Sequence, residues 1–223
     1  MRTKKSIINA VVATLASAVG MVLGFVTQKV FLECLGLEYS GANGLFTNIM
    51  SMLCIVELGI GSAIVYNLYK PIAENNKEKI ISLMYFYRKC YRILAAIIFG
   101  LGLILLPFVP FFVGENSIQE SMYLLYFLAL IDTVFSYLLS YKRSILMANQ
   151  ENYIVNLVHM GYLIFMNLFE IGLLYMTKNY ILYLVSRIIF RIAENLVITL
   201  IANKKYPYIN AKHYEKLSKD IQN

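Results

Sequence analysis

The chain has 223 residues, of which 59% are hydrophobic and only 15% are charged, and its formal net charge is +7. Soluble domains have roughly 45–50% apolar residues, so this composition favours a membrane protein. It leaves no room for a separate soluble domain. We therefore expect an all-α integral membrane protein.

A helix that crosses a bilayer needs about 20 predominantly apolar residues. Six segments of the chain meet this requirement, and they predict transmembrane helices over residues 7–31, 44–69, 93–113, 121–141, 154–176 and 181–202. The connections between them are short. We expect residues 1–203 to form one transmembrane unit and residues 204–223 to form a polar cytoplasmic tail.

The first predicted span follows a short basic region, but it is too long for a cleavable signal peptide and no clear small-residue cleavage site follows it. We expect it to be retained as a helix. Its residues Gly20 and Gly24 belong to a stripe of small side chains that allows another helix to approach closely. Lys29 lies near the predicted outer end, where a long side chain can reach the headgroups.

The second predicted span carries Glu57 near its middle, with Gly59 close behind. Residues 77–92 mix basic and aromatic side chains, which favours either a helix in the inner membrane interface or an inner extension of the third span. Pro107 and Pro110 are expected to kink or end that third span.

The basic and acidic residues outside the predicted spans are concentrated in different loops. Basic residues occupy the N-terminus, alternate loops and the C-terminal tail: Arg2, Lys4, Lys5, Lys70, Lys77, Lys79, Arg88, Lys89, Arg92, Lys142, Arg143, Lys204, Lys205, Lys212, Lys216 and Lys219. The other loops hold Glu33, Glu38, Glu115 and Glu120, with Lys178 as their basic residue. This positive-inside pattern predicts a multi-pass protein with both termini in the cytoplasm. The net charge therefore indicates topology, and no nucleic-acid partner is expected.

Six ionisable residues fall inside the predicted spans, namely Glu57, Asp132, Glu170, Arg187, Arg191 and Glu194. Each costs about 2.5–3.5 kcal/mol at the bilayer centre on insertion scales, so they must face one another, the bundle interior or water. The acidic residues Glu57, Asp132, Glu170 and Glu194 are candidates for charge balance or ion coupling. Glu57 and Asp132 could balance the arginines, or take up and release a proton or a sodium ion.

The sixth predicted span has the densest charge. Arg187 and Arg191 are about 40° apart around a helix, and Glu194 falls on the same face. Glu194 can pair with Arg191, which leaves Arg187 less neutralised. Guanidinium groups suit bidentate recognition of phosphate oxygens, so one interpretation is an anion site in a central cavity. The other is a structural network of salt bridges with Asp132 or Glu57.

Other kinds of site have little support in the sequence. His159 is either a proton carrier or, more commonly for such a residue, a hydrogen-bonded packing residue. Cys34, Cys54 and Cys90 show no disulfide or metal-binding spacing. No nucleotide-binding glycine loop, metalloprotease motif or nucleophile elbow is present, so we expect neither an enzyme nor a cofactor or metal site.

The motifs LGLEYSG (35–41), GLFTNI (44–49), ELGIGSAI (57–64) and LYKP (68–71) occur in this order. Together they resemble the N-terminal region of Wzx-type bacterial polysaccharide flippases, members of the multidrug/oligosaccharidyl-lipid/polysaccharide exporter superfamily. The resemblance implies that the chain is the first six-helix, MATE-like lobe of such a transporter. The family has two lobes, so the chain would be a truncated or half-size unit.

The resemblance also implies a function. Such proteins move undecaprenyl-diphosphate-linked oligosaccharides from the inner to the outer leaflet of the bacterial plasma membrane for surface polysaccharide biosynthesis. Arg187, Arg191 and Lys29 are the candidates to bind the diphosphate and glycan. The implied partners are the lipid-linked oligosaccharide, membrane lipids, a second six-helix lobe (a separate chain or a second copy) and polysaccharide polymerase or assembly proteins.

Two alternatives remain open from the sequence. The first is a cation-coupled drug exporter of the same superfamily, against which the LYKP motif and the arginine pair argue. The second is a non-transporting membrane scaffold for polysaccharide assembly, against which the cost of six charged residues within the membrane argues.

Overall fold

The computed structural model describes residues 2–57, 59–114, 117–138 and 140–210, and this part of the chain forms helices joined by turns, with no strand. The helices are α1 (Arg2–Leu35), α2 (Leu37–Leu53), α3 (Ile60–Ala73), α4 (Lys77–Leu105), α5 (Val109–Val113), α6 (Met122–Leu138), α7 (Arg143–Ala148), α8 (Asn152–Thr177) and α9 (Tyr180–Lys205). Four short 3-10 helices complete the order: η1 (Cys54–Glu57), η2 (Leu106–Phe108), η3 (Ser140–Lys142) and η4 (Pro207–Asn210).

Four segments are long and apolar enough to cross a membrane: Ile7–Leu35, Lys77–Val113, Met122–Ala148 and Asn152–Thr177. Large apolar side chains are exposed along α1, α4 and α8, as expected for surfaces that face lipid. The chain is thus all-helical and has the features of an α-helical membrane protein. The count of six spans and the likeness to a transporter lobe stay predictions.

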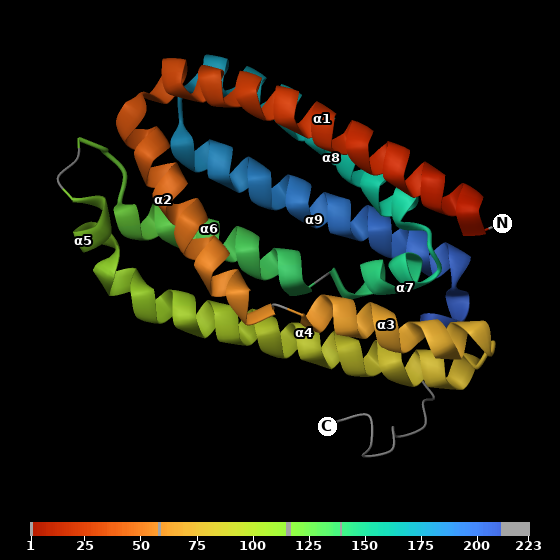
Figure 1. The fold of residues 1–223 in the computed structure, drawn as a ribbon. Helices are drawn as coiled ribbons and strands as arrows, with labels where there is room; N and C mark the ends of the chain where they lie inside the picture. Colours follow the sequence, from red (N-terminus) through yellow and green to blue (C-terminus); the bar gives the residue numbers. More distant parts are fainter. Residues whose placement is uncertain (1, 58, 115–116, 139, 211–223) are drawn as a thin grey trace.

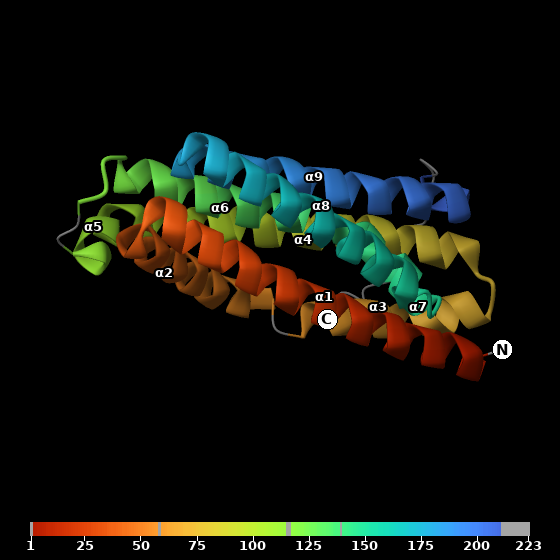
Figure 2. The same ribbon diagram turned by 90° about the horizontal axis from the view of Figure 1, so that it is seen from above.

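The long helices pack side by side in a bundle (Figure 1). Helix α1 lies along α8, α8 packs against α9, α9 against α6, and α6 against α4. The turned view shows α1, α2 and α3 on one side of the bundle and α4, α6 and α9 on the other (Figure 2). The N-terminus, α7 and the end of α9 lie at one end of the bundle. The α1–α2 and α8–α9 connections lie at the other end.

The predicted second span, 44–69, is divided in two. Helix α2 ends at Leu53, η1 follows, and α3 begins at Ile60 after Gly59, whose φ of 89° is left-handed. A residue with a side chain rarely adopts that conformation, so glycine permits the break there. The predicted fourth span, 121–141, also ends in irregular backbone at η3, after which the chain continues into α7.

The third predicted span, 93–113, begins inside a longer helix. Helix α4 is continuous from Lys77 to Leu105, so residues 77–92 are an extension of this span and not a separate interfacial helix. Asn76 caps its first turn, because its side-chain oxygen accepts a hydrogen bond from the Lys79 amide at 3.0 Å. Pro107 and Pro110 fall where α4 gives way to η2 and α5, as predicted.

Hydrogen bonds connect neighbouring segments of the chain at each end of the bundle. At the end with the α1–α2 connection, the Ser117 amide and hydroxyl both donate to the Glu38 carboxylate at 2.7 Å. These bonds lower the pKa of Glu38. At the other end, Tyr206 donates to Glu151 at 2.9 Å, and burial raises the pKa of Tyr206 so that it stays a donor. Of the predicted tail, residues 204–210 form the end of α9 and η4, and residues 211–223 lie outside the described residues.

The packing of α4 against α6 depends on a glycine and yields a prediction. A Cβ at Gly102 would lie within 2.7 Å of Leu130 Cδ2 and closer still to Cδ1, and Leu130 is fully buried. We expect Gly102→Ala to destabilise the protein by about 1–3 kcal/mol through overpacking. Thermal unfolding in detergent measures the effect.

The matched control lies two residues earlier on the same helix. A Cβ at Gly100 meets nothing within 4 Å. Gly100→Ala should therefore leave the unfolding midpoint unchanged or raise it slightly, since alanine is the better helix former by up to about 1 kcal/mol. Equal midpoints for the two variants would contradict close packing at Gly102.

Candidate functional site

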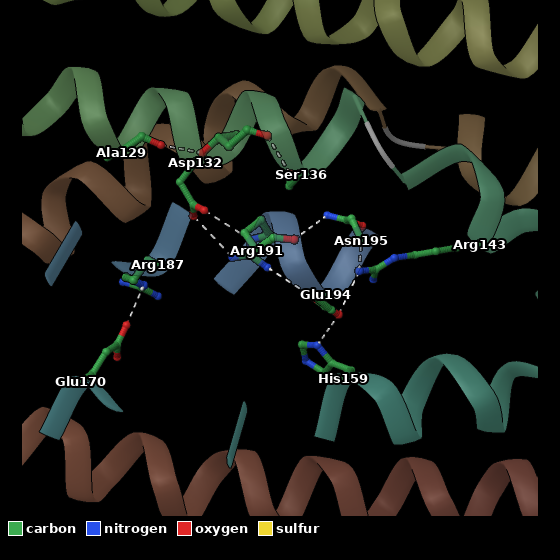
Figure 3. A network of polar contacts seen from close by, with 11 residues as sticks. Ala129, Asp132, Ser136, Arg143, His159, Glu170, Arg187, Arg191, Glu194 and Asn195 are labelled. Atoms are coloured by element: carbon green, nitrogen blue, oxygen red, sulfur yellow. Dashed lines mark hydrogen bonds and ion pairs between the residues drawn. The ribbon is translucent and has the colours of Figure 1, made fainter. Parts of the chain in front are cut away.

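The charged face of α9 lies in the interior of the bundle, between α6 and α8 (Figure 3). Arg187, Arg191 and Glu194 lie three or four residues apart, so one face of the helix carries all three. The neighbouring helices contribute partners of opposite charge to this face. The site is therefore a network of ion pairs inside the bundle, and its pairs differ in closeness.

The first pair joins Arg187 to Glu170 of α8. Arg187 Nε lies 3.8 Å from Glu170 Oε1, and the Glu170 side chain is only 2% exposed. Neither of these two atoms makes a hydrogen bond within the protein. The Arg187 guanidinium also lies 5.6 Å from the ring centre of Tyr183, a cation–π distance. Arg187 is therefore neutralised by charge proximity rather than by a closed hydrogen-bonded pair.

The second pair joins Arg191 to Asp132 of α6. Arg191 Nε and Nη2 each lie 3.4 Å from one oxygen of the Asp132 carboxylate. Close pairs of this kind have distances near 2.7–2.9 Å, so this bidentate pair is long. The Arg191 guanidinium lies 5.6 Å from the ring centre of Tyr162. Its second carboxylate neighbour, Glu194, is 4.0 Å away.

Glu194 has closer partners than the Arg191 side chain predicted for it. Its Oε1 accepts a hydrogen bond from Arg143 Nη2 at 2.9 Å and lies 3.0 Å from His159 Nδ1. Arg143 also donates to Asn195 at 3.1 Å. The expected Glu194–Arg191 pair is thus a secondary contact. His159 is a hydrogen-bonded residue stacked on Tyr162, with ring centres 5.6 Å apart.

Arg143 is the member of the network that the sequence did not indicate. It begins α7, just after the fourth predicted span. A basic residue at the end of a span is most simply interpreted as a marker of the cytoplasmic side. Its contact with α9 depends on how α7 packs in the bundle, which a hydropathy pattern does not show. Its partners Glu194 and Asn195 were both visible as polar residues within a predicted span.

Two cavities adjoin the network. The larger, about 1080 Å³, is lined by residues of α3, α7 and α9, among them Arg143 and Arg191. The smaller, about 410 Å³, lies among α2, α6 and α9, and Asp132 and Arg187 line it. Residues common to both linings are Cys54, Ser136 and Arg191. Arg191 therefore lies at the boundary between the two spaces.

Glu57 lines the larger cavity but belongs to a different environment from the arginine network. The hydroxyl groups of Tyr91 and Tyr137 are its hydrogen-bonding neighbours. Among the described residues it forms no ion pair, so the predicted pairing of Glu57 with the arginines is not present. Its carboxylate lies just before the break at Gly59, where backbone and side chains of α3 line the same cavity.

Lys29, the third predicted binding residue, lies away from this site. Its side chain is 77% exposed and pairs with Glu33 at 3.7 Å, one turn further along α1. It lines neither cavity. An exposed pair of this kind contributes little to stability, about 0–1 kcal/mol.

The chemistry available to the site follows from its composition. Arg143, Arg187 and Arg191 face Asp132, Glu170 and Glu194, so the network is formally neutral. Donors of Arg187 and Arg191 remain available at the cavity walls because the pairs of these two arginines with carboxylates are long. Within the described ranges, no three histidine, cysteine or acidic side chains form a group that could hold a metal ion, and the three cysteines are free thiols.

Comparisons with models of protein families, with curated proteins and with solved structures gave no match for this chain. The class that the fold and site define is therefore an α-helical protein with membrane-spanning character and a buried charge network beside two cavities. The family resemblance noted from the sequence stays a prediction.

The network yields a prediction for Glu194. Glu194→Gln keeps the size of the side chain and removes its charge, which leaves Arg143 without its carboxylate. We expect a loss of about 3 kcal/mol, the lower end of the range for breaking a buried pair. Glu33→Gln removes the acid of the exposed Lys29 pair and should cost less than about 1 kcal/mol. Similar losses for both variants, measured by thermal unfolding in detergent, would contradict the network.

Proposed function

We propose that the protein takes part in moving an undecaprenyl-diphosphate-linked oligosaccharide from the inner to the outer leaflet of a bacterial plasma membrane, for surface polysaccharide biosynthesis. The single observation that carries this proposal is the position of Arg191, which borders both cavities. A cationic side chain between two spaces at membrane depth is suited to pass an anionic headgroup from one to the other.

The loose pairing of the arginines supports binding over a purely structural role. The carboxylates lie 3.4–4.0 Å from Arg187 and Arg191, farther than in a closed pair. A diphosphate offers more acceptor oxygens than a carboxylate and can engage guanidinium groups in bidentate fashion. The carboxylates then serve to keep the empty site neutral, which lowers the cost of holding arginines inside the membrane.

The larger cavity has the size expected for a bulky polar ligand. Its volume of about 1080 Å³ reaches the upper end of the range for ligand sites, about 300–1,000 Å³. Its lining includes hydroxyl and amide side chains, namely Ser62, Tyr66, Asn67, Tyr69, Tyr91, Ser136, Tyr137, Ser140, Ser144 and Asn195. Such groups can exchange hydrogen bonds with sugar hydroxyls.

The proposed function requires partners. These are a second six-helix lobe, as a separate chain or a second copy of this one, and polysaccharide assembly proteins.

A second function, cation-coupled drug export, is favoured by one observation. Glu57 lines the larger cavity together with aromatic side chains and has no ion-pair partner among the described residues. A carboxylate among tyrosines suits a cationic ligand. The two functions differ in which charge is essential, because an anionic substrate needs the arginines and a cationic drug needs Glu57.

The test replaces the two arginines of α9. In cells that depend on this protein for surface polysaccharide, we expect Arg187→Gln/Arg191→Gln to reduce the polysaccharide at least about tenfold, the effect of losing about 1.4 kcal/mol of binding free energy. Protein abundance in the membrane is measured alongside, because the same change also removes partners of Glu170 and Asp132.

The matched control, Lys178→Gln/Lys204→Gln, removes two exposed cations outside both cavities and should leave the polysaccharide unchanged. Normal polysaccharide in the arginine variant, at normal abundance, would contradict the anion site. Loss of resistance to cationic drugs on Glu57→Gln, with polysaccharide intact, would favour the export function instead.

A further inference from the structure

The exposed face of α4 changes character along its length. Its first part presents exposed Tyr85, Arg88, Lys89 and Arg92, and its second part presents exposed Ile93, Ile97, Leu101 and Ile104. The transition falls between Arg92 and Ile93. A helix that faces lipid shows such a transition where the hydrocarbon core gives way to the headgroups.

The length of the apolar part agrees with that assignment. The chain from Ile93 to Val113 corresponds to the predicted third span, and about 20 helical residues cover the roughly 30 Å of a hydrocarbon core. This assignment puts Arg92 at the level of the lipid phosphates, with Arg88 one turn further out. Helix α4 begins at Lys77 at the end of the bundle that carries the N-terminus and the end of α9 (Figure 1). The charge distribution predicts that this end faces the cytoplasm.

A buried cation, Lys142, lies in the segment that packs against α4. Helix η3 packs against α4, and its Lys142 is 6% exposed. Lys142 Nζ donates to the side-chain oxygens of Asn203 and Asn210, the latter at 2.9 Å, and lies 5.8 Å from the ring centre of Tyr141. Arg88 and Arg92 act electrostatically on Tyr141, and Arg88 acts on Lys142. The three cations thus belong to one cluster.

The cluster lacks a carboxylate in the part of the chain that the structure describes, where no acid forms an ion pair with Arg88, Arg92 or Lys142. The arrangement contrasts with α9, where every arginine has an acidic partner. Gathering three like charges raises the energy of the folded state unless an anion joins them. At this depth the anion available in a membrane is a lipid phosphate.

We propose that Arg88 and Arg92 bind the phosphate headgroup of an anionic phospholipid in the leaflet at this end of the bundle. Their guanidinium groups lie on one helix face, one turn apart, and can each donate two hydrogen bonds to phosphate oxygens. Tyr141, on which both arginines act electrostatically, can supply a further donor, and the buried Lys142 strengthens the local positive potential. The site is separate from the cavities and does not depend on the transported substrate.

The ligand also has a structural consequence. The lipid phosphate would join α4 to η3, the irregular segment between α6 and α7. Arg143, which pairs with Glu194 in the charge network, follows directly after η3. Anionic lipid bound there therefore stabilises the segment that positions Arg143. The measurable outcome is a rise in the unfolding temperature with lipid charge.

The test titrates the purified full chain, in neutral detergent, with phosphatidylglycerol or with zwitterionic phosphatidylcholine while the unfolding midpoint is recorded. We expect phosphatidylglycerol alone to raise the midpoint. In Arg88→Gln/Arg92→Gln the half-saturating lipid concentration should increase at least about tenfold, since each cation near a membrane surface adds to anionic lipid attraction. The single variants Arg88→Gln and Arg92→Gln should show smaller increases and serve if the double variant does not fold.

The control Lys29→Gln/Lys178→Gln removes two exposed cations from the opposite end and should leave the titration unchanged. Glycerol phosphate, which has the phosphate without acyl chains, should not raise the midpoint; a rise would indicate a free-phosphate site and overturn the lipid assignment. An unchanged titration in the Arg88 and Arg92 variants would also overturn it. So would loss of the lipid effect in Arg187→Gln/Arg191→Gln, because that would place the lipid in the cavities. The transport proposal can fail without affecting these results.

Discussion

The need to neutralise the arginines of α9 determines much of the arrangement of this bundle. An unpaired guanidinium within an apolar environment is costly, and α9 carries Arg187 and Arg191 far from either end of the helix. Helices α6 and α8 flank α9, and each provides a carboxylate, Asp132 and Glu170. Because the partners come from different helices, the pairs hold those helices on opposite sides of α9. Glu194 of α9 connects α7 to the network in the same way, because it pairs with Arg143.

Arg187 and Arg191 can be neutralised by carboxylates and still bind an anionic ligand, because their ion pairs are long. A closed bidentate pair would use the donors of an arginine, whereas carboxylates at 3.4–4.0 Å leave those donors able to turn to a stronger acceptor. The irregular backbone at Gly59 and at η3 borders the larger cavity, and such backbone is tolerated at membrane depth only beside protein or water. The interrupted spans and the charge network thus both favour a polar interior.

Hydropathy predicted the long helices well, because burial in a bilayer demands long apolar runs. Residues 154–176 and 181–202 lie within α8 and α9, and the extension of α4 was one of two open alternatives. The break after Leu53 and the 3-10 segment η3 were not predicted, since irregular backbone beside a cavity leaves apolar composition unchanged. Periodicity placed Arg187, Arg191 and Glu194 on one face, yet it could not choose partners on other helices. That choice depends on tertiary packing, which is why Arg143 was missed and Lys29 was included.

The most direct test of the account concerns water access to the space beside Arg191. Cys54 lines both cavities, as Arg191 does, and it is a native thiol. With Cys34 and Cys90 replaced by alanine, a charged, membrane-impermeant methanethiosulfonate reagent should modify Cys54 in membrane vesicles, because such reagents react with thiolate formed in water. Modification of the folded protein is the predicted result. A Cys54 that reacts only after denaturation would contradict a polar, water-filled site at the centre of the bundle.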